Sequence, residues 1–390
     1  MSENLSQSTG LVPTGGEAHR KPRVAVVFGG RSSEHAISVV TAGAVLRAID
    51  RTKYDVLPIG ITSDGRWALT ADEPDRMAIA DQKLPSVSDL AESVEGGVVL
   101  PVDPSSREVV YSEPGSVPKA LGEVDVVFPV LHGPYGEDGT LQGLLELSGI
   151  PYVGAGVLAS AVGQDKEYMK RVFTSFGLPV GPYVVVRPRE WAQDPSAARK
   201  KVVDFAADHG WPVFVKPARA GSSIGITKVD DLSGLDDAIE EAQRHDPKIL
   251  VEALLRGREI ECGVLEFEDG PRASVPAEIP PVSAHDFYDF EAKYIDSAAG
   301  LVPAPLDAEQ TAEVQRLAVE AFEAASCEGL VRADFFLTED GEFVINEINT
   351  MPGFTPISMY PRMWQESGVG YGELVDCLVQ AALRRSTGLR

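Results

Sequence analysis

Four side chains near the C-terminus have the types and the spacing of a site for a metal ion and an anion. Arg332 and Asp334 are two residues apart, as are Glu347 and Asn349. Side chains alternate along a β-strand, so each pair shares one face of its strand. If the two strands pair, three oxygen-bearing side chains and one guanidinium meet on one surface. Such oxygen ligands suit Mg²⁺, a hard cation that prefers carboxylates together with phosphate oxygens.

The sequence between the two pairs predicts a hairpin. Residues 331–337 and 343–349 are β-rich and flank Asp340-Gly341, a dipeptide that favours a tight turn because both positions tolerate positive φ. An alternative is an edge hairpin with a solvated polar face, since most Asp and Glu side chains are simply exposed. The apolar runs 335–337 and 343–345 argue against it, because unpaired charge among apolar residues is costly. We therefore favour a metal site.

Length and composition predict a globular protein of two or three domains. The chain has 390 residues, 44% of them hydrophobic, and its mean hydropathy is -0.05. No apolar run approaches the length of a membrane span, so we expect no membrane partner. The net charge of -24 disfavours nucleic acid as a partner, and an anionic substrate would need a local cluster of Lys and Arg.

The N-terminal segment and the cysteines indicate the compartment. Residues 1–22 are rich in Ser, Gly and Thr and lack an apolar core, which predicts a disordered leader and not a signal peptide. The cysteines Cys262, Cys327 and Cys377 are odd in number and fit no metal-knuckle spacing. We expect free thiols in a reducing cytoplasm.

The first part of the chain predicts an open α/β sheet. The apolar run 23–28, the turn Gly29-Gly30 and a helix capped by Ser32 or Ser33 form a strand–turn–helix unit. Ligands of such sheets bind in the crevice beyond the strand ends. The acidic, Pro/Ser/Gly-rich stretch 72–118 predicts insertions and hairpins.

Two candidate binding residues lie at the ends of these elements. Glu34 lies in the first turn of that helix, where a carboxylate can simply complement the helix dipole, and on the residues alone we favour that interpretation. The strands 54–61 and 124–131 follow, and His132 stands at the end of the second, where the Gly-rich loop 132–139 begins. A lone His is more often structural, but the crevice position gives a binding role equal weight.

A second domain is expected from about residue 155. Gly154-Ala155-Gly156 nominally matches a dinucleotide fingerprint, but no suitable acidic residue ends a following strand, so we reject a nicotinamide site. Residues 211–217 predict a strand ending in Lys216, before the Gly/Ser-rich loop 218–228. Such a loop lets backbone N–H groups approach phosphate oxygens, although its spacing is not that of a Walker A loop. We expect a β-hairpin lid over a triphosphate; the alternative is an ordinary Gly/Ser hairpin.

The remaining segments predict a strand edge that could bind a nucleotide, and two loops. The strand 248–255 can offer backbone groups to a purine, and Glu259 can accept bonds from ribose hydroxyls, although neither role is visible from sequence alone. Residues 283–304 are irregular and chemically rich, which predicts a loop closing over a site. In the constrained loop 350–359, the Gly353 N–H could point at a developing oxyanion. Amphipathic helices are expected at 311–326 and 371–385.

Taken together, Lys216, the Gly/Ser loop and the hairpin residues make the chain similar to the ATP-grasp superfamily. Four motifs then narrow the resemblance to the D-alanine–D-alanine ligase family. They occur in the family's order and are GGRSSE at 29–34, HGPYGEDG at 132–139, EAKY at 291–294 and NEINTMPGFT at 346–355. Several independent motifs in order rarely match by chance.

The resemblance implies how the first substrate would be held. Glu34 would hold the ammonium group of the first D-alanine, with His132 nearby. Ser222 and Tyr294 would hydrogen-bond with Glu34 and so latch the lid and the long loop over the site.

The resemblance also implies how the second substrate and the reacting centre would be held. Ser358 and the Met359 amide would receive the carboxylate of the second D-alanine. Lys293 would contact this carboxylate or the γ-phosphate. Arg332 and the Gly353 amide would stabilise the tetrahedral centre.

The resemblance implies ATP as the nucleotide, with Lys166 and Lys216 on its phosphates. The implied ATP-binding residues are Lys166, Lys216, Ser222, Ser223, Glu252, Leu254, Leu255, Glu259, Phe287, Lys293, Asn346 and Glu347. Asp334, Glu347 and Asn349 would bind two Mg²⁺ or Mn²⁺ ions. One departure is Ala253, where some relatives carry a Lys that touches the purine, which puts that one contact in doubt.

The implied architecture is α/β (α+β) of the ATP-grasp kind. After the leader 1–22, an open parallel α/β domain at 23–154 would bind substrate. A central subdomain at 155–255 with the Gly/Ser lid and a C-terminal subdomain at 256–390 would sandwich ATP. The C-terminal subdomain would carry the metal site and a long loop at 276–305.

The implied activity is ATP-dependent ligation of two D-alanines through an acyl phosphate, for peptidoglycan precursors, in a cytoplasmic homodimer. Alternatives are a D-alanine–D-lactate ligase and another ATP-grasp carboxylate–amine ligase. Lys293 and Tyr294 favour an amine acceptor. A non-catalytic nucleotide-binding module is a further alternative, against which the intact metal set and Arg332 argue.

Overall fold

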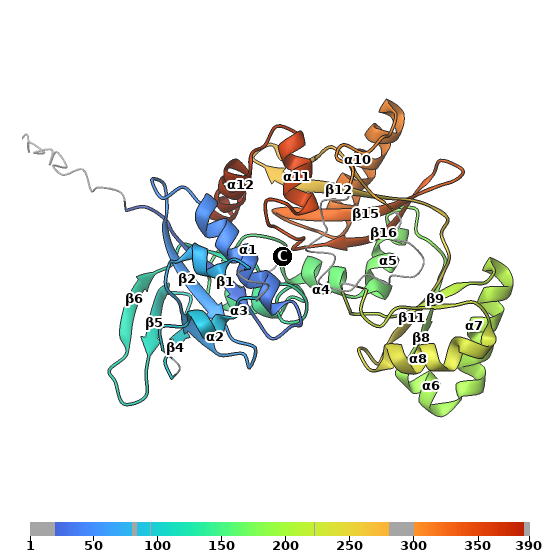
Figure 1. Ribbon diagram of the computed structural model, residues 1–390, viewed down its shortest axis with the longest axis horizontal. Helices are drawn as coiled ribbons and strands as arrows, with labels where there is room; N and C mark the ends of the chain where they lie inside the picture. Colours follow the sequence, from blue (N-terminus) through green and yellow to red (C-terminus); the bar gives the residue numbers. More distant parts are fainter. Residues whose placement is uncertain (1–19, 80–83, 94, 222, 281–299, 386–390) are drawn as a thin grey trace, which may run out of the picture.

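The computed structural model describes residues 20–79, 84–93, 95–221, 223–280 and 300–385. Within these ranges the strands form four sheets, and helices cover them in three regions that meet around the centre of the molecule (Figure 1). Residues 1–19 of the predicted leader 1–22 lie outside the described residues. The end of the predicted leader is ordered, because the Arg20 guanidinium donates to the Asp125 carboxylate at 2.6 and 2.9 Å.

The N-terminal region is the expected open sheet. Strand β1 (Arg23–Gly29) lies between β2 (Asp55–Ile61) and β7 (Val126–Pro129), both parallel to it, and β3 (Trp67–Leu69) adds an antiparallel edge. The continuous apolar run makes β1 almost wholly buried, as in a strand covered on both faces. Helix α1 (His35–Ala48) follows β1 directly, which confirms the first strand–turn–helix unit.

The cap of α1 differs from the prediction. Glu34 occupies the N-cap position and makes no capping bond, so Ser32 and Ser33 do not cap this helix. The Ser32 hydroxyl instead donates to the His132 carbonyl at 2.7 Å and accepts from the Glu34 N–H at 3.2 Å. The serine therefore ties two loops together and leaves Glu34 at the helix start.

The stretch 72–118 contains the short strands β4 and β5, and β6 follows it directly; the three pair in the order β4-β5-β6, as the predicted hairpins require. Further helices of this region are α3, which begins at Thr140 directly after the Gly-rich loop 132–139, and two short turns. The bounds are β4 (Gly97–Val99), β5 (Glu108–Ser112), β6 (Lys119–Glu123), α3 (Thr140–Leu147), η1 (Pro74–Met77) and α2 (Val87–Leu90).

The second region is a four-stranded sheet in the order β10-β9-β11-β8, in which each neighbouring pair is antiparallel. Its strands are β8 (Tyr183–Val186), β9 (Val213–Pro217), β10 (Thr227–Val229) and β11 (Ile249–Ala253). The helices here are α6 (Pro188–Gln193), α7 (Pro195–His209) and α8 (Leu235–Gln243), preceded by α4 (Val157–Gln164) and α5 (Lys166–Ser175). Strands β9 and β10 form the predicted hairpin around the Gly/Ser loop.

The third region carries the hairpin of the four polar residues. Its sheet runs β13-β12-β15-β16, with β14 also paired to β12. The strands are β12 (Gly257–Phe267), β13 (Gly270–Ala273), β14 (Ala277–Ile279), β15 (Leu330–Thr338) and β16 (Phe343–Asn349), and α10 (Ala308–Ala324) packs on them. The long loop does not begin at residue 276 as predicted, because 277–279 are hydrogen-bonded to β12.

The C-terminal helices join the third region to the first. Helix α11 (Met359–Glu366) and helix α12 (Tyr371–Arg384) contribute to one apolar core that also contains the buried faces of β1, β7 and α1. Phe354 is fully buried in this core, close to Phe128. Among the described helices, none has the length and apolar character needed to cross a membrane.

Candidate active site

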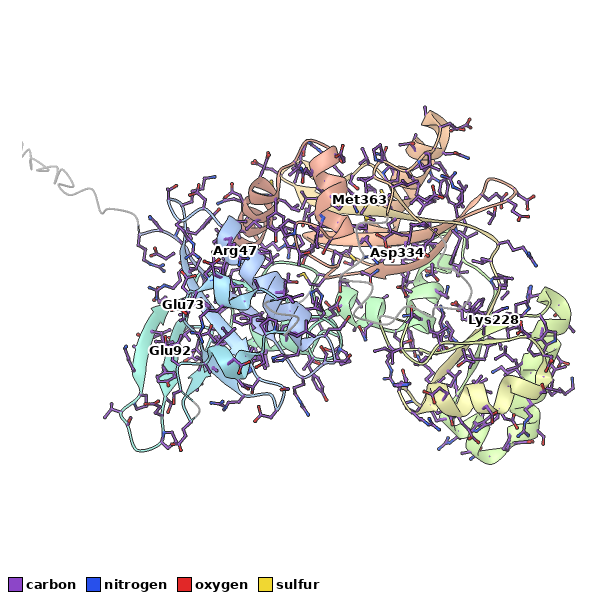
Figure 2. The ribbon with its side chains drawn as sticks, viewed as in Figure 1. Arg47, Glu73, Glu92, Lys228, Asp334 and Met363 are labelled. Carbon is purple, nitrogen blue, oxygen red and sulfur yellow. The ribbon has the colours of Figure 1, made fainter. Side chains whose placement is uncertain are left out.

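The predicted hairpin forms and brings its four polar side chains together. In the antiparallel register of β15 and β16, Arg332 faces Asn349 and Asp334 faces Glu347. Gly341 takes a φ of +84° in the connecting turn, a conformation that glycine adopts without steric cost. The strands thus place these residues on one surface of the central sheet, where Asp334 is labelled in Figure 2.

Asp334 is the centre of this surface. Its carboxylate accepts two bonds of 2.7 Å from the Arg332 guanidinium and one of 2.9 Å from the Asn349 amide. Burial raises the pKa of Asp334, and the neighbouring Glu347 carboxylate adds to that rise, against the effect of Arg332. The buried Asp334 carboxylate and the half-buried Glu347 carboxylate, held side by side, make a place where a divalent cation relieves repulsion.

The donors present fit a hard cation. In the described part of the chain, no three His, Cys, Asp or Glu side chains are grouped to hold a metal ion. An ion here would therefore be held by Asp334, Glu347 and the amide oxygen of Asn349. These are oxygen ligands of the type that Mg²⁺ takes together with phosphate oxygens.

A third carboxylate, which was not predicted, lies beside Arg332. Glu261 of β12 is paired in register with Asp334, and its Oε1 is 3.3 Å from Arg332 Nε. The guanidinium is thus fixed by Asp334 of its own strand and by Glu261 of the neighbouring strand β12. Only the pairing of β12 with β15 reveals this, although the alternation of Glu259 and Glu261 in the sequence was the signal available.

Three lysines and two glutamates form a largely buried charge cluster beside the hairpin, in which Lys170 and Lys216 are buried and the other three are half-buried. Lys166 Nζ is 3.1 Å from Glu347 Oε2, Lys170 Nζ is 3.0 Å from Glu252 Oε1, and Lys216 pairs with the second oxygen of Glu252. Burial favours the neutral acid, but Lys216 and Lys170 outweigh it and lower the pKa of Glu252 to about 2. Three cations and two anions leave a positive excess, which suits a polyphosphate.

The lysine side chains also set the protonation state of the Glu347 carboxyl. Burial would raise the pKa of this carboxyl, yet Lys166 and Lys216 lower it to about 2. Lys166 and Lys216, predicted separately from two distant segments, therefore lie close to the predicted metal ligands.

The root of the Gly/Ser loop is tied to this cluster. Lys166 Nζ donates to the Ala220 carbonyl at 2.9 Å. Ser223 takes a φ of +58° and Gly225 a φ of +71°, and a side chain at Gly225 would approach the His245 ring to within 2.6 Å. Ser222 lies outside the described residues.

The strand predicted at 248–255 to border the nucleotide is β11 together with the residues that follow it. The strand ends at Ala253, so Leu254 and Leu255 lie in the connection to β12. Leu255 packs against Gly181, and Glu259 is exposed on β12. The Asn346 carbonyl accepts a 3.4 Å bond from Lys170, which brings β16 to the same cluster.

The motif at 132–139 contacts Met351, in the loop that follows the hairpin. His132 Nδ1 is 3.1 Å from the Met351 carbonyl, which cannot donate, so Nδ1 carries the proton. His132 Nε2 is buried and has no hydrogen-bond partner among the described residues. Burial lowers the pKa of His132, against the effect of Glu34. The neutral ring thus presents a bare acceptor.

Glu137 makes the second contact to Met351 and was not predicted. It accepts from the Gly133 N–H at 2.5 Å and from the Met351 N–H at 3.2 Å. Burial and the Glu34 carboxylate raise the pKa of Glu137 to about 8. A side chain at Gly133 would come within 3.0 Å of Glu34 Oε2. The loops of the motifs 29–34 and 132–139 therefore bring Glu34, His132 and Glu137 close together. The HGPYGEDG pattern was the only signal for Glu137 in the sequence.

The loop after Met351 carries the other predicted residues. Ser358 is the N-cap of α11 but makes no capping bond; its hydroxyl is 2.8 Å from the Thr355 hydroxyl. Met359 is the first residue of that helix. Gly353 precedes Phe354, whose buried ring fixes the loop in the core. Phe287, Lys293 and Tyr294 lie outside the described residues.

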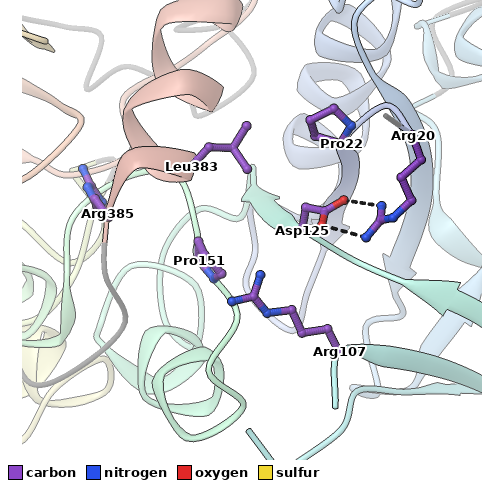
Figure 3. Close-up of a pocket in the computed structure, with 7 residues that line it drawn as sticks. All are labelled: Arg20, Pro22, Arg107, Asp125, Pro151, Leu383 and Arg385. Carbon is purple, nitrogen blue, oxygen red and sulfur yellow. Dashed lines mark hydrogen bonds and ion pairs between the residues drawn. The ribbon is translucent and has the colours of Figure 1, made fainter. Parts of the chain in front are cut away.

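A cavity of about 330 Å³ lies away from this site, at the outer end of the N-terminal sheet (Figure 3). Arg20, Arg107 and Arg385 line it together with Asp125. Arg20 makes 2.6 and 2.9 Å bonds to Asp125, and Arg385 Nη1 donates to the Gly154 carbonyl at 2.7 Å. Two of the three guanidinium groups are thus committed to protein partners.

Comparisons with known proteins agree with this geometry. The models "D-ala D-ala ligase N-terminus" and "D-ala D-ala ligase C-terminus" match residues 23–155 and 172–380. A D-alanine–D-alanine ligase of Streptomyces avermitilis is 84% identical over 389 residues, which is 100% of both chains. One of Pseudarthrobacter chlorophenolicus is 58% identical and covers 95% of this chain and 96% of its own.

Solved structures are also similar. A D-alanine–D-alanine ligase from Coxiella burnetii has a TM-score of 0.76 and 34% identity, over 93% of this chain and 94% of that one. The VanG D-Ala:D-Ser ligase from Enterococcus faecalis has a TM-score of 0.79 and 34% identity, over 93% of this chain and 100% of that one.

Proposed function

Because the chain belongs to the D-alanine–D-alanine ligase family, we propose that it joins two D-alanine molecules into D-alanyl-D-alanine and converts ATP to ADP and phosphate. The chain has the ATP-grasp fold of that family. It is a ligase that uses ATP, and its product fits the building of the cell wall. One observation supports the assignment most directly: Met351, which follows the hairpin of Asp334 and Glu347, contacts His132 and Glu137 of the motif 132–139.

The first half-reaction activates a carboxylate. We propose that Lys166 and Lys216 bind the phosphates of ATP, because they supply the positive excess of the buried cluster. The γ-phosphoryl group passes to the carboxylate of the first D-alanine, giving an acyl phosphate and ADP. The chain provides position and charge here, as phosphoryl transfer demands.

The divalent ions are a finer part of the proposal. Asp334, Glu347 and Asn349 would hold two Mg²⁺ or Mn²⁺ ions, which supply neutralisation of phosphate charge when bound. The support is the all-oxygen donor set and the raised pKa of the buried Asp334 carboxyl.

The first D-alanine would lie at the N-terminal motif. Its ammonium group would pair with Glu34 and donate to the bare Nε2 of His132. In the proposed roles, Ser222 and Tyr294 bond to Glu34, and the lid keeps water from the acyl phosphate.

The second half-reaction forms the peptide bond. The amine of the second D-alanine attacks the acyl carbon, and phosphate leaves. Arg332 and the Gly353 amide would stabilise the oxyanion, and Arg332 is well placed because Asp334 and Glu261 fix its guanidinium. Ser358 and the Met359 amide would bind the second carboxylate, with Lys293 beside it.

The remaining ATP contacts complete the proposal. Glu252, Leu254, Leu255 and Glu259 would bind adenine and ribose. Ser223, Phe287, Lys293 and Asn346 would complete the nucleotide site. Ala253 leaves the purine without the lysine contact of some relatives.

The setting of the reaction is also proposed. The free thiols Cys262 and Cys327, both buried, suit the cytoplasm, which also supplies ATP. A homodimer is expected, which light scattering of the purified protein would test. The expected domains are 23–154, 155–255 and 256–390.

The decisive experiment measures phosphate release from ATP and Mg²⁺ with D-alanine, L-alanine, D-serine or D-lactate. We expect phosphate release with D-alanine. When D-alanine and D-lactate are supplied together, we expect D-alanyl-D-alanine to be the main product. Dominant depsipeptide would overturn the acceptor assignment. Absence of D-alanine-dependent release would favour a non-catalytic nucleotide-binding module.

A further inference from the structure

A buried ion network adjoins the lysine cluster at the start of α5. Its centre is Lys248, which is 8% exposed and immediately precedes β11. Lys248 Nζ is 2.6 Å from both carboxylate oxygens of Asp165 and 3.0 Å from Glu167 Oε2. Glu167 is fully buried. None of these residues belongs to the proposed binding set.

Asp165 and Glu167 flank Lys166 in the chain. Asp165 is the N-cap of α5 and accepts from the Tyr168 N–H at 3.3 Å. Lys166 is the first residue of that helix, and its side chain runs to Glu347 and to the Ala220 carbonyl. Lys248 therefore holds both neighbours of Lys166, while Lys166 itself reaches into the nucleotide site.

The backbone makes a second link between the same elements. The Ala218 N–H donates to the Lys248 carbonyl at 2.9 Å, and the Lys166 N–H donates to the Ala218 carbonyl at 3.0 Å. Arg219 adds two 2.8 Å bonds to Asp246, whose carboxylate also accepts from the Lys248 N–H at 3.0 Å. The first residues of the Gly/Ser loop are thus fixed between Lys166 and Lys248.

We propose that Lys248 is a positioning residue for the polyphosphate of ATP, acting through Lys166 and the first residues of the Gly/Ser loop. This inference rests on the proposed ATP-binding role of Lys166. Lys248 does not itself reach the nucleotide, because its ammonium group is occupied by two carboxylates and lies 4.9 Å from the centre of the Tyr168 ring.

Lys248 and Glu167 are buried, so the loss of Lys248 is costly. Removing one partner of a buried ion pair leaves the other charge uncompensated, which is strongly unfavourable. Without Lys248, Asp165 loses the cation that it is paired with, and Glu167 keeps Arg171 and Arg187 as its ion-pair partners among the described residues. The first turn of α5 then shifts toward water, and Lys166 with it.

The experiment is a double-mutant cycle on nucleotide binding. Binding of ATP with Mg²⁺ is measured by calorimetry without D-alanine for wild type, Lys248→Met, Lys166→Met and the double variant. Lys201→Met removes an exposed lysine of α7 in the same region and serves as the matched control. We expect Lys248→Met to raise Kd about tenfold, which corresponds to about 1.4 kcal/mol, and to change Kd less than twofold when Lys166 is already Met.

Two further variants keep the proposal testable. Lys248→Arg retains the charge and should restore most of the affinity. Asp165→Asn retains an N-cap residue and should weaken binding in the same Lys166-dependent way, and it decides the matter if Lys248→Met does not fold. Equal effects with and without Lys166, or an unchanged Kd in Lys248→Met, would overturn the proposal. Because no D-alanine is present, failure of the ligase assignment would leave this result unaffected.

Discussion

Replacement of Glu137 by glutamine tests the electrostatics of the contact between the loop 132–139 and the loop that follows the hairpin. The Glu137 carboxyl bridges Gly133 and Met351 while burial and Glu34 raise its pKa from 4.5 to about 8. The folded protein therefore holds a proton that the unfolded chain releases near pH 4.5. The resulting stabilisation is complete below that pH and is lost as the pH rises through 8.

The magnitude follows from the two pKa values. Between pH 6 and pH 9 the wild-type free energy of unfolding should fall by about 2.7 kcal/mol from this one group. Glutamine cannot ionise, so Glu137→Gln lacks this contribution. The difference in unfolding free energy between the two proteins should therefore change by about 2.7 kcal/mol across that range.

Urea unfolding followed by circular dichroism at pH 6, 7, 8 and 9 measures this difference. Glu108→Gln, at an exposed position on β5, is the control for loss of a carboxylate in the same region. A difference between wild type and Glu137→Gln that stays constant from pH 6 to pH 9 would refute the reasoning.

Three further predictions address the hairpin and the core. Glu347→Gln should abolish turnover by weakening metal bridging, and steady-state rates across Mg²⁺ concentrations check it; near-wild-type rates would contradict the metal assignment. Arg332→Ala should lower kcat roughly 10²–10³-fold or more, by analogy with loss of an oxyanion donor, and phosphate release at saturating substrate measures it; an unchanged kcat would remove Arg332 from the site. Phe354→Ala empties a fully buried ring position between Phe128 and Tyr360 and should cost about 3–5 kcal/mol of unfolding free energy, measured by urea unfolding; a cost below about 1 kcal/mol would show that the loop is not fixed by this ring.

The hairpin could be predicted because its signals are local. Asp340-Gly341 specifies the turn, and strand alternation then puts Asp334 and Glu347 on one surface. The register that the structure adopts pairs these two residues directly.

Contacts between distant segments could not be predicted in this way. Glu261 reaches Arg332 only because β12 pairs with β15, and Glu137 reaches Met351 across more than two hundred residues. The predicted N-cap of α1 was wrong for the same reason, because the Ser32 hydroxyl donates to the distant His132 carbonyl. Motif resemblance supplied candidate roles, but the partners of each side chain depend on tertiary packing.

The position of α12 has a consequence for how this protein is made. The last helix supplies Leu374, Leu378 and Ala382 to the same apolar core as β1, the first strand. During synthesis the opening sheet emerges hundreds of residues before the helix that completes its cover. The nascent chain must therefore keep that apolar face from aggregating until translation is nearly finished, and a C-terminal truncation before α12 should leave an insoluble product.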